Sequence, residues 1–250
     1  SIIRSANKTK YQYVNTLAEI YLEGKEVPSD QVMAFDYLKK AENMLDDNEC
    51  IHYATSRYLR TQIAELYDDY SRTEGDKQKA FELYYRAWDE GETIALYHVG
   101  WMYFVQKYRS NFSQVDESKL INQLRTEAPK SNSSNLAYLL GVIYFNGYYG
   151  SCDKRESEKW WLMAIEKGSY SAYSRLILYY ANDPKKYTEA FRMAAKGHQA
   201  GFVEATYYLG QCYARGIGVK KSRSQAKEYY KEAAAKGYED AQRELKKFLF

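Results

Sequence analysis

Residues 205–219 read ATYYLGQCYARGIGV, and residues 226–237 read AKEYYKEAAAKG. In both segments small and apolar residues recur at intervals of three and four, while Lys, Glu, Gln and Arg fill the positions between them. Such spacing places the apolar residues on one face of a helix and the polar residues on the other. Gly216 and Gly218 separate the two segments. The segments therefore predict a pair of amphipathic helices joined by a turn.

The same helix pair recurs along the chain. Each predicted first helix has a small residue followed three places later by tyrosine, at Ala18/Tyr21, Ala64/Tyr67, Gly100/Tyr103, Gly141/Tyr144 and Gly210/Tyr213, with a weaker copy at Ile177/Tyr180. Most second helices run from a small residue to an alanine, at Ala34 to Ala41, Ala80 to Ala87, Ser157 to Ala164 and Ala226 to Ala233. Repetition at about 30 to 45 residues is typical of stacked helix pairs. We expect the small residues to let the paired backbones approach closely, with the tyrosine one turn later covering the gap.

Glycines follow the predicted second helices. They are Gly91, Gly168, Gly197 and Gly237, and three of them come directly after a lysine. Glycine readily adopts the left-handed conformation that closes a helix, and a cation suits the negative end of the helix dipole. Each of the four is therefore predicted to end a helix.

The predicted fold class is all-α, a right-handed α-α superhelix of about six helix pairs in a single domain. The expected units are residues 12–45, 58–91, 94–127, 135–168, 171–197 and 204–237, with a terminal helix at 239–250. Residues 106–134 form an irregular insertion, because they lack the aromatic pattern of a second helix. Within it, Ser113 and Asp116 are candidates to cap a shorter helix that ends near Glu127, before Pro129.

The segments at 205–219 and 226–237 resemble a nearly complete Sel-one-like repeat, a relative of the tetratricopeptide repeat with a longer turn between its helices. Residues 138–168 resemble it well, and the first three units resemble it more weakly. The resemblance implies an α-solenoid that serves as a protein-interaction scaffold or adaptor. By analogy with tetratricopeptide proteins, the partner would bind a concave wall formed by the first helix of every pair.

The residues at the wall positions change in character along the chain. The first two units offer the acidic residues Glu19, Glu23, Glu65, Asp68 and Asp69. The middle units offer large rings and one valine: Tyr97, Trp101, Phe104, Tyr138, Val142 and Phe145. The last units offer milder residues: Ser174, Leu178, Asn182, Tyr207, Gln211 and Arg215. The predicted partner is a protein or peptide with a basic segment and an apolar anchor. Alternatively, Trp101, Phe104 and Phe145 pack under the insertion at 106–134 and contact no partner.

Composition argues against nucleic acid or a membrane as the main partner. The net charge is +3, from 36 Lys and Arg against 33 Asp and Glu, and the two signs are mixed along the chain. No apolar run approaches the roughly 18 residues of a spanning helix. We therefore expect a soluble chain without direct membrane insertion. Because Ser1 could follow a removed leader, the compartment stays open among cytoplasm, periplasm and secretory lumen.

No motif of catalysis or cofactor binding stands out. Cys50, Cys152 and Cys212 are far apart, and the Cys50/His52 pair lacks a second pair at metal-ligand spacing. The run from Gly216 to Ser222 lacks the glycine that a phosphate-binding loop has directly before Lys-Ser. We expect no cofactor, no metal and no enzymatic activity.

Two other functions fit the pattern less directly. One is an inhibitor or immunity protein whose acidic and aromatic wall neutralises a secreted toxin or enzyme. The other is a hydrolase, which requires a nucleophile such as Cys212 to meet a distant histidine in the groove. The sequence shows no such pair.

Overall fold

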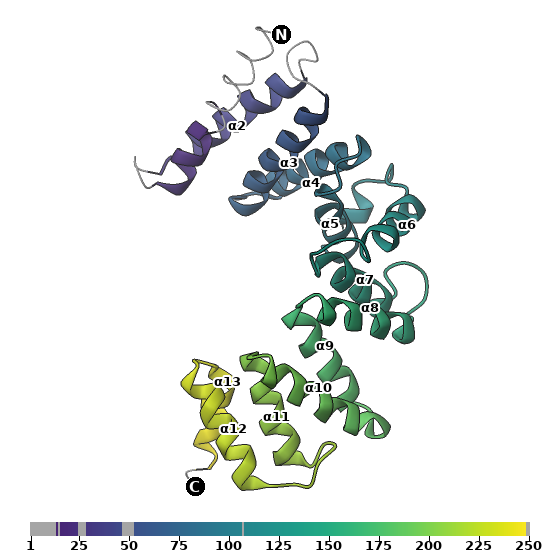
Figure 1. The fold of residues 1–250 in the computed structure, drawn as a ribbon. Coiled ribbons are helices and arrows are strands. Elements are labelled where there is room, and N and C mark those ends of the chain that lie inside the picture. The colour runs from purple at the N-terminus through teal and green to yellow at the C-terminus, as the bar shows by residue number, and fades with distance from the viewer. Residues whose placement is uncertain (1–13, 15, 25–28, 47–52, 107, 249–250) are drawn as a thin grey trace. The chain divides into compact units, whose positions relative to one another are not determined.

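The computed structural model describes residues 14, 16–24, 29–46, 53–106 and 108–248, and their regular structure is helical throughout (Figure 1). The predicted all-α fold class is confirmed. Contacts between residues divide the chain into two compact units, residues 1–121 and 122–250, where the sequence predicted one domain.

The first unit, residues 1–121, is built from helices that bury one face each. Residues 16–23 are helical, and the elements that follow are α2 (Gln31–Asp46), α3 (Tyr53–Asp69), α4 (Glu74–Asp89), α5 (Ala95–Gly100), a π-helical turn η1 (Trp101–Val105) and a 3-10 turn η2 (Tyr108–Ser110). Helices α3 and α4 form the most extensively packed pair of this unit. Ile63 of α3 and Phe81, Leu83 and Tyr84 of α4 are fully buried there.

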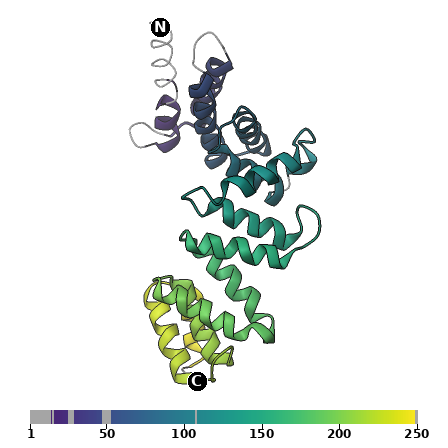
Figure 2. The same ribbon diagram turned by 45° about the vertical axis from the view of Figure 1, so that its right-hand side comes forward.

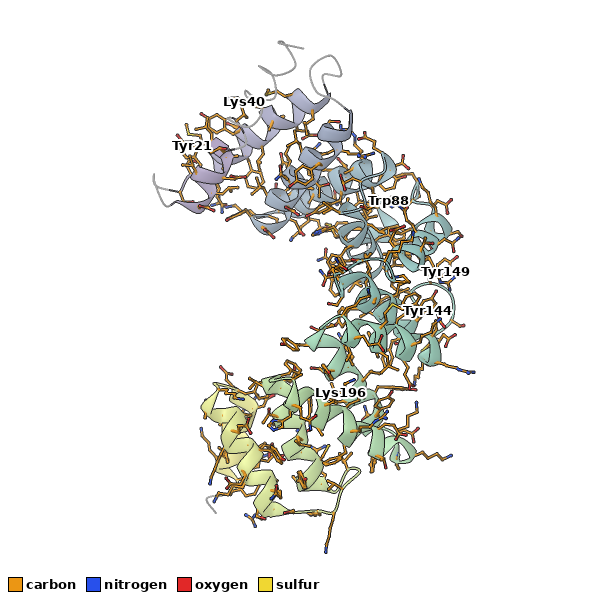
Figure 3. The ribbon with its side chains drawn as sticks, viewed as in Figure 1. Tyr21, Lys40, Trp88, Tyr144, Tyr149 and Lys196 are labelled. Atoms are coloured by element: carbon orange, nitrogen blue, oxygen red, sulfur yellow. The ribbon has the colours of Figure 1, made fainter. Side chains whose placement is uncertain are left out.

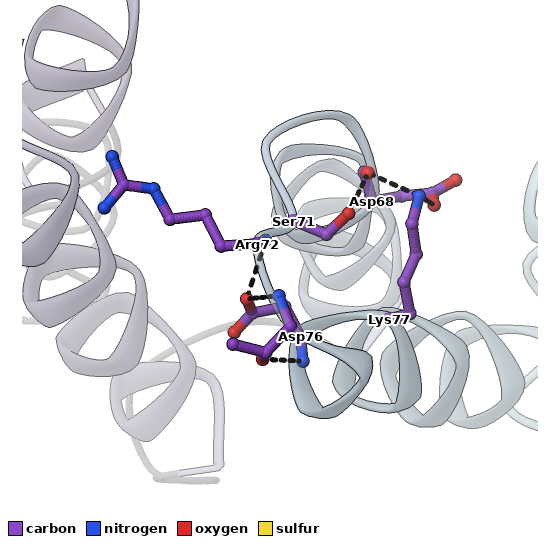
Figure 4. A network of polar contacts seen from close by, with 6 residues as sticks. Asp68, Ser71, Arg72, Asp76 and Lys77 are labelled. Atoms are coloured by element: carbon purple, nitrogen blue, oxygen red, sulfur yellow. Dashed lines mark hydrogen bonds and ion pairs between the residues drawn. The ribbon is translucent and has the colours of Figure 1, made fainter.

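The turn between α3 and α4 is held by side chains (Figure 4). The Asp76 carboxylate accepts hydrogen bonds of 2.9 Å from the backbone N–H groups of Arg72 and Thr73, while the Thr73 hydroxyl accepts one from the Asp76 N–H. This reciprocal arrangement is a capping box. Lys77 reaches back from α4, where its ammonium donates to the Asp68 carbonyl at 2.7 Å and pairs with the Asp68 carboxylate. The end of one helix is thereby tied to the start of the next.

The insertion packs onto α4 and then starts a new helix. The Phe112 ring lies 4.3 Å from that of Phe81, centre to centre. Helix α6 (Glu117–Glu127) follows, and the Asp116 carboxylate caps it by accepting from the Lys119 N–H at 2.9 Å. The Lys119 ammonium lies 4.9 Å from the ring of Trp88, which Figure 3 labels. The predicted cap at Asp116 and the predicted helix end at Glu127 are confirmed.

The second unit, residues 122–250, contains three helix pairs and a closing helix. Its elements after α6 are α7 (Asn135–Asn146), α8 (Lys154–Glu166), α9 (Tyr170–Ala181), a 3-10 turn η3 (Pro184–Lys186), α10 (Tyr187–Gln199), α11 (Val203–Arg215), α12 (Arg223–Ala235) and α13 (Glu239–Lys246). Helices α7 and α8, α9 and α10, and α11 and α12 pack as successive pairs (Figure 2). Helix α13 packs on α12, and its Ala241 joins Tyr230 and Ala233 in one buried cluster. It covers the apolar face that the last pair would otherwise expose.

The small residues of the first helices make room for rings of the second helices. A Cβ atom on Gly141 would lie 2.2 Å from Cδ1 of Trp161, and one on Gly210 would lie 2.7 Å from the Tyr230 ring. Backbones do come close at the first of these pairs, since the Ser157 hydroxyl donates to the Gly141 carbonyl at 2.8 Å. The ring over each glycine therefore comes from the neighbouring helix, and not from the tyrosine one turn later as predicted.

Glycine ends most second helices as predicted, with one exception. Gly91, Gly168 and Gly237 have φ angles of 95°, 87° and 85°. Gly197 instead lies inside α10, where a Cβ atom would come within 2.6 Å of the Ala205 methyl group. The helix continues to Gln199, and Gly201 adopts the left-handed conformation with φ 80°. The prediction was wrong at Gly197 because this glycine serves close packing between helices.

Candidate functional site

Two adjoining pockets form a groove on the second unit. The larger has a volume of about 470 Å³ and is lined by Phe145, Lys154, Trp161, Arg175, Leu178, Tyr179, Asn182 and Asp183. The smaller has a volume of about 80 Å³ and is lined by Ile177, Leu178, Ala181, Asn182, Tyr208, Gln211, Cys212, Arg215 and Ile217. Leu178 and Asn182 of α9 line both, so the pockets meet at this helix. We call these lining residues the α9 groove.

Aromatic rings form the apolar part of the α9 groove. Trp161 is 1% exposed, and its ring lies 5.1 Å from the ring of Phe145. The Phe145 ring also meets Tyr179 edge to face at 5.9 Å. Leu178 stands beside these rings and is 44% exposed, although leucine is usually buried. The groove therefore presents an accessible aliphatic side chain beside packed rings.

Three cations line the α9 groove: Lys154, Arg175 and Arg215. Arg175 donates from Nε to the Tyr138 hydroxyl at 3.3 Å. Within the described part of the chain, none of the three forms an ion pair with a carboxylate. The one carboxylate of the lining, Asp183, accepts a hydrogen bond of 3.0 Å from the Lys185 N–H. Positive charge therefore dominates this groove.

Glu65, Asp68 and Asp69 of α3 form an acidic face on the first unit, beside Tyr84 of α4 and His98 of α5. Burial raises the pKa of Glu65, and the charge of Asp69 raises it further. The His98 imidazole stacks on Tyr84 with 4.3 Å between ring centres. Burial lowers the pKa of His98, while the charges of Asp68 and Asp69 oppose that shift. Three of the predicted acidic residues, Glu65, Asp68 and Asp69, are therefore neighbours, although Lys77 neutralises Asp68.

The other predicted wall residues differ in accessibility. Glu19 and Glu23 lie on the helical residues 16–23, with Glu19 half-buried and Glu23 exposed. Tyr97 and Trp101 are half-buried, with ring centres 6.0 Å apart. Tyr138, Phe145 and Gln211 are half-buried and Arg215 is exposed, all on the second unit. The structure thus brings five predicted wall residues to the α9 groove: Phe145, Leu178, Asn182, Gln211 and Arg215.

Three predicted wall residues are buried in the core: Phe104 at 2%, Val142 at 4% and Tyr207 at 8% exposure. The prediction that they line an accessible wall was wrong. Phe104 lies in the π-helical turn η1, whose wider winding changes the direction of the side chains that follow. The guanidinium of Arg109, in the insertion, lies 5.8 Å from the centre of the Phe104 ring. Helix α7 is buried along most of its length around Val142, and Tyr207 packs 5.1 Å from Tyr238.

The profile of the Sel1 repeat family matches residues 16–44, 64–92, 135–169 and 203–238, more than half of the chain. The chain belongs to the Sel1 repeat family. Sel1 repeat proteins generally serve as protein-interaction scaffolds and are typically non-enzymatic, which implies protein partners.

Two solved structures share the Sel1 repeat fold with this chain. One is a protective antigen of uropathogenic Escherichia coli strains with an SLR fold, at 21% identity and a TM-score of 0.63, aligned over 98% of this chain and 51% of that one. The other is a Sel1 repeat protein from Oxalobacter formigenes, at 21% identity and a TM-score of 0.61, aligned over 95% and 65%. The chain spans about half of the first protein and slightly less than two thirds of the second.

In the larger pocket of the α9 groove, sequence reasoning missed five lining residues: Lys154, Trp161, Arg175, Tyr179 and Asp183. Helix α9 lies between the third and fourth matched Sel1 repeats, where the repeat pattern is weak. The wall positions taken by analogy with tetratricopeptide proteins cover only one face of this helix. Arg175, one turn before Leu178, is the signal that could have widened the prediction, because residues three apart on a helix are surface neighbours.

Cys212, the nucleophile named for the hydrolase alternative, is buried. Burial raises the pKa of the Cys212 thiol to about 11, so it stays protonated near neutral pH and is a poor nucleophile. No group of His, Cys, Asp and Glu side chains that could hold a metal occurs within the described ranges. The Cys50/His52 pair lies outside them. None of the helices described is long and apolar enough to cross a membrane.

Proposed function

We propose that this Sel1 repeat protein binds a segment of a partner polypeptide in the α9 groove. The observation that carries the proposal is Leu178, an exposed leucine at the junction of two pockets that are lined by α8 and by three successive first helices, α7, α9 and α11. Exposed apolar surface next to packed rings and rimmed by polar groups is typical of a protein-binding site. Binding of another protein is also the general role of Sel1 repeat proteins.

The dimensions suit an extended peptide. Directly packed helices lie about 8–10 Å apart, and α7, α9 and α11 pack mainly through α8 and α10, so the three extend over at least roughly 20 Å. An extended chain covers about 3.3–3.6 Å per residue, so about six residues would contact the groove. Binding would order those residues, and the apolar contact at Leu178 must offset that cost.

We propose a separate role for the acidic face of the first unit. Glu65 and Asp69 have no ion-pair partner in the described chain, and their charges would attract a basic segment of a partner. Charges at the surface contribute mainly to the rate of association, and the attraction weakens as salt is added. The α9 groove would supply the apolar contact.

Selection of peptides from a random display library against the full chain tests this function. Peptides enriched on the wild-type protein should lose binding to Leu178→Glu, because a carboxylate would face the apolar anchor. The matched control is Leu162→Glu on α8, a leucine with 36% exposure that lines neither pocket. Circular dichroism would verify that both variants fold. Peptides that bind Leu178→Glu as well as wild type would refute the groove as the site.

A further inference from the structure

The cations of the α9 groove lie on both sides of its apolar centre. Lys154 and Arg175 line the larger pocket and Arg215 lines the smaller one, while Leu178 lines both. An apolar side chain seated at Leu178 would therefore have positive charge toward each pocket. The three cations belong to three different helices, α8, α9 and α11.

The surrounding carboxylates offset this charge only in part, because the lining holds three cations and one carboxylate, Asp183. Asp183 is engaged by the Lys185 N–H at 3.0 Å. Glu158 accepts from the Tyr180 hydroxyl at 2.7 Å and pairs with Lys186 at 3.0 Å. Lys186 in turn donates to the hydroxyl of Tyr179 at 3.3 Å, so this ion pair contacts a residue that lines the groove. The three lining cations have no comparable partner among the described residues.

Helix stability does not explain all three cations. Lys154 is the first residue of α8, where the positive end of the helix dipole disfavours a cation. Arg175 lies mid-helix and hydrogen-bonds a neutral phenol. Arg215, in the last turn of α11, is the one cation that the dipole favours. Recognition of an anionic partner accounts for all three positions together.

We propose that the α9 groove selects a polypeptide segment with an apolar anchor flanked by Asp or Glu residues. This inference rests on the proposed function and defines the chemistry of its partner. It differs from the basic segment predicted from the sequence, which suits the acidic face of the first unit. Carboxylates of the segment would pair with Arg175 and Arg215, and arginine can bind a carboxylate through two parallel hydrogen bonds.

The composition of the selected peptides separates this inference from the proposed function. Peptides that require Leu178 and carry Asp or Glu beside an apolar residue are the expected result. Peptides that require Leu178 but are neutral or basic around the anchor would overturn the inference and leave the proposed function standing. If no enriched peptide depends on Leu178, both proposals fail.

Measured affinities of one enriched peptide then test the charge pairs. Fluorescence polarisation with Arg175→Ala or Arg215→Ala should show affinity reduced roughly three- to tenfold, and Gln in place of the acidic residues of the peptide should cause a similar loss. The matched control is Arg192→Ala, an exposed arginine of α10 that lines neither pocket. Arg175→Glu should recover binding of a peptide in which only the acidic residue that pairs with Arg175 is changed to Lys. Equal affinity for all arginine variants would contradict the proposal.

Discussion

Trp161 lies directly over Gly141, so closely that a Cβ atom on residue 141 would come within 2.2 Å of the indole. The same indole lines the α9 groove, where it contacts Phe145. A packing contact inside a Sel1 repeat thus also fixes the floor of the proposed binding site. This relationship links stability to binding, and both can be measured in one variant.

Gly141→Ala should therefore destabilise the protein and weaken peptide binding. Overpacking costs about 1–3 kcal/mol, and the higher helix propensity of alanine returns at most about 1 kcal/mol. The matched control is Gly75→Ala in α4, where a Cβ atom would meet only the Thr73 hydroxyl at 3.4 Å. Urea unfolding should show a lower midpoint for Gly141→Ala alone. A Gly141→Ala midpoint at or above that of Gly75→Ala would show that the Trp161 contact is not restrictive.

The capping box of α4 should contribute to stability in a pH-dependent way. Hydrogen bonds from the Arg72 and Thr73 N–H groups lower the pKa of Asp76, against the opposing effect of burial. A lowered folded-state pKa gives stability that is present above the usual pKa of about 3.9 and is lost as the pH falls through the folded-state value. Asp76→Asn should cost about 1 kcal/mol at neutral pH and little at very low pH. Thermal unfolding across this range would measure it, and a difference that grows on acidification would disagree with the assignment.

The two described cysteines should differ in reactivity. Cys152 is exposed, whereas Cys212 is buried with a pKa of about 11. Compared with an ordinary thiol, Cys212 carries roughly a few hundredfold less thiolate near neutral pH. Iodoacetamide should modify Cys152 in the native protein and Cys212 only after unfolding, as peptide mapping by mass spectrometry would show. Rapid native labelling of Cys212 would revive the hydrolase alternative.

Phe104 should matter for stability, because it is 2% exposed. Phe104→Ala should lower the free energy of unfolding by about 3–5 kcal/mol. Ile94→Ala provides the comparison, because Ile94 is 52% exposed and its loss should cost little. Unfolding monitored by circular dichroism would compare the two. Equal stabilities would mean that Phe104 is accessible after all.

The sequence by itself determined the local elements. The helix pair at 205–219 and 226–237 and the cap at Asp116 were predicted because helical periodicity and capping depend on residues a few positions apart. The glycine ends at Gly91, Gly168 and Gly237 follow from the same local rules.

The tertiary structure decided which faces stay accessible. Gly197 has the sequence context of a helix end, but it packs against Ala205, and Phe104 has the character of an exposed anchor but is covered by the insertion. The α9 groove likewise depends on residues of α7, α8, α9 and α11 that meet only in the folded unit. Burial depends on contacts between helices distant in sequence, whereas periodicity records only that each helix has an apolar face.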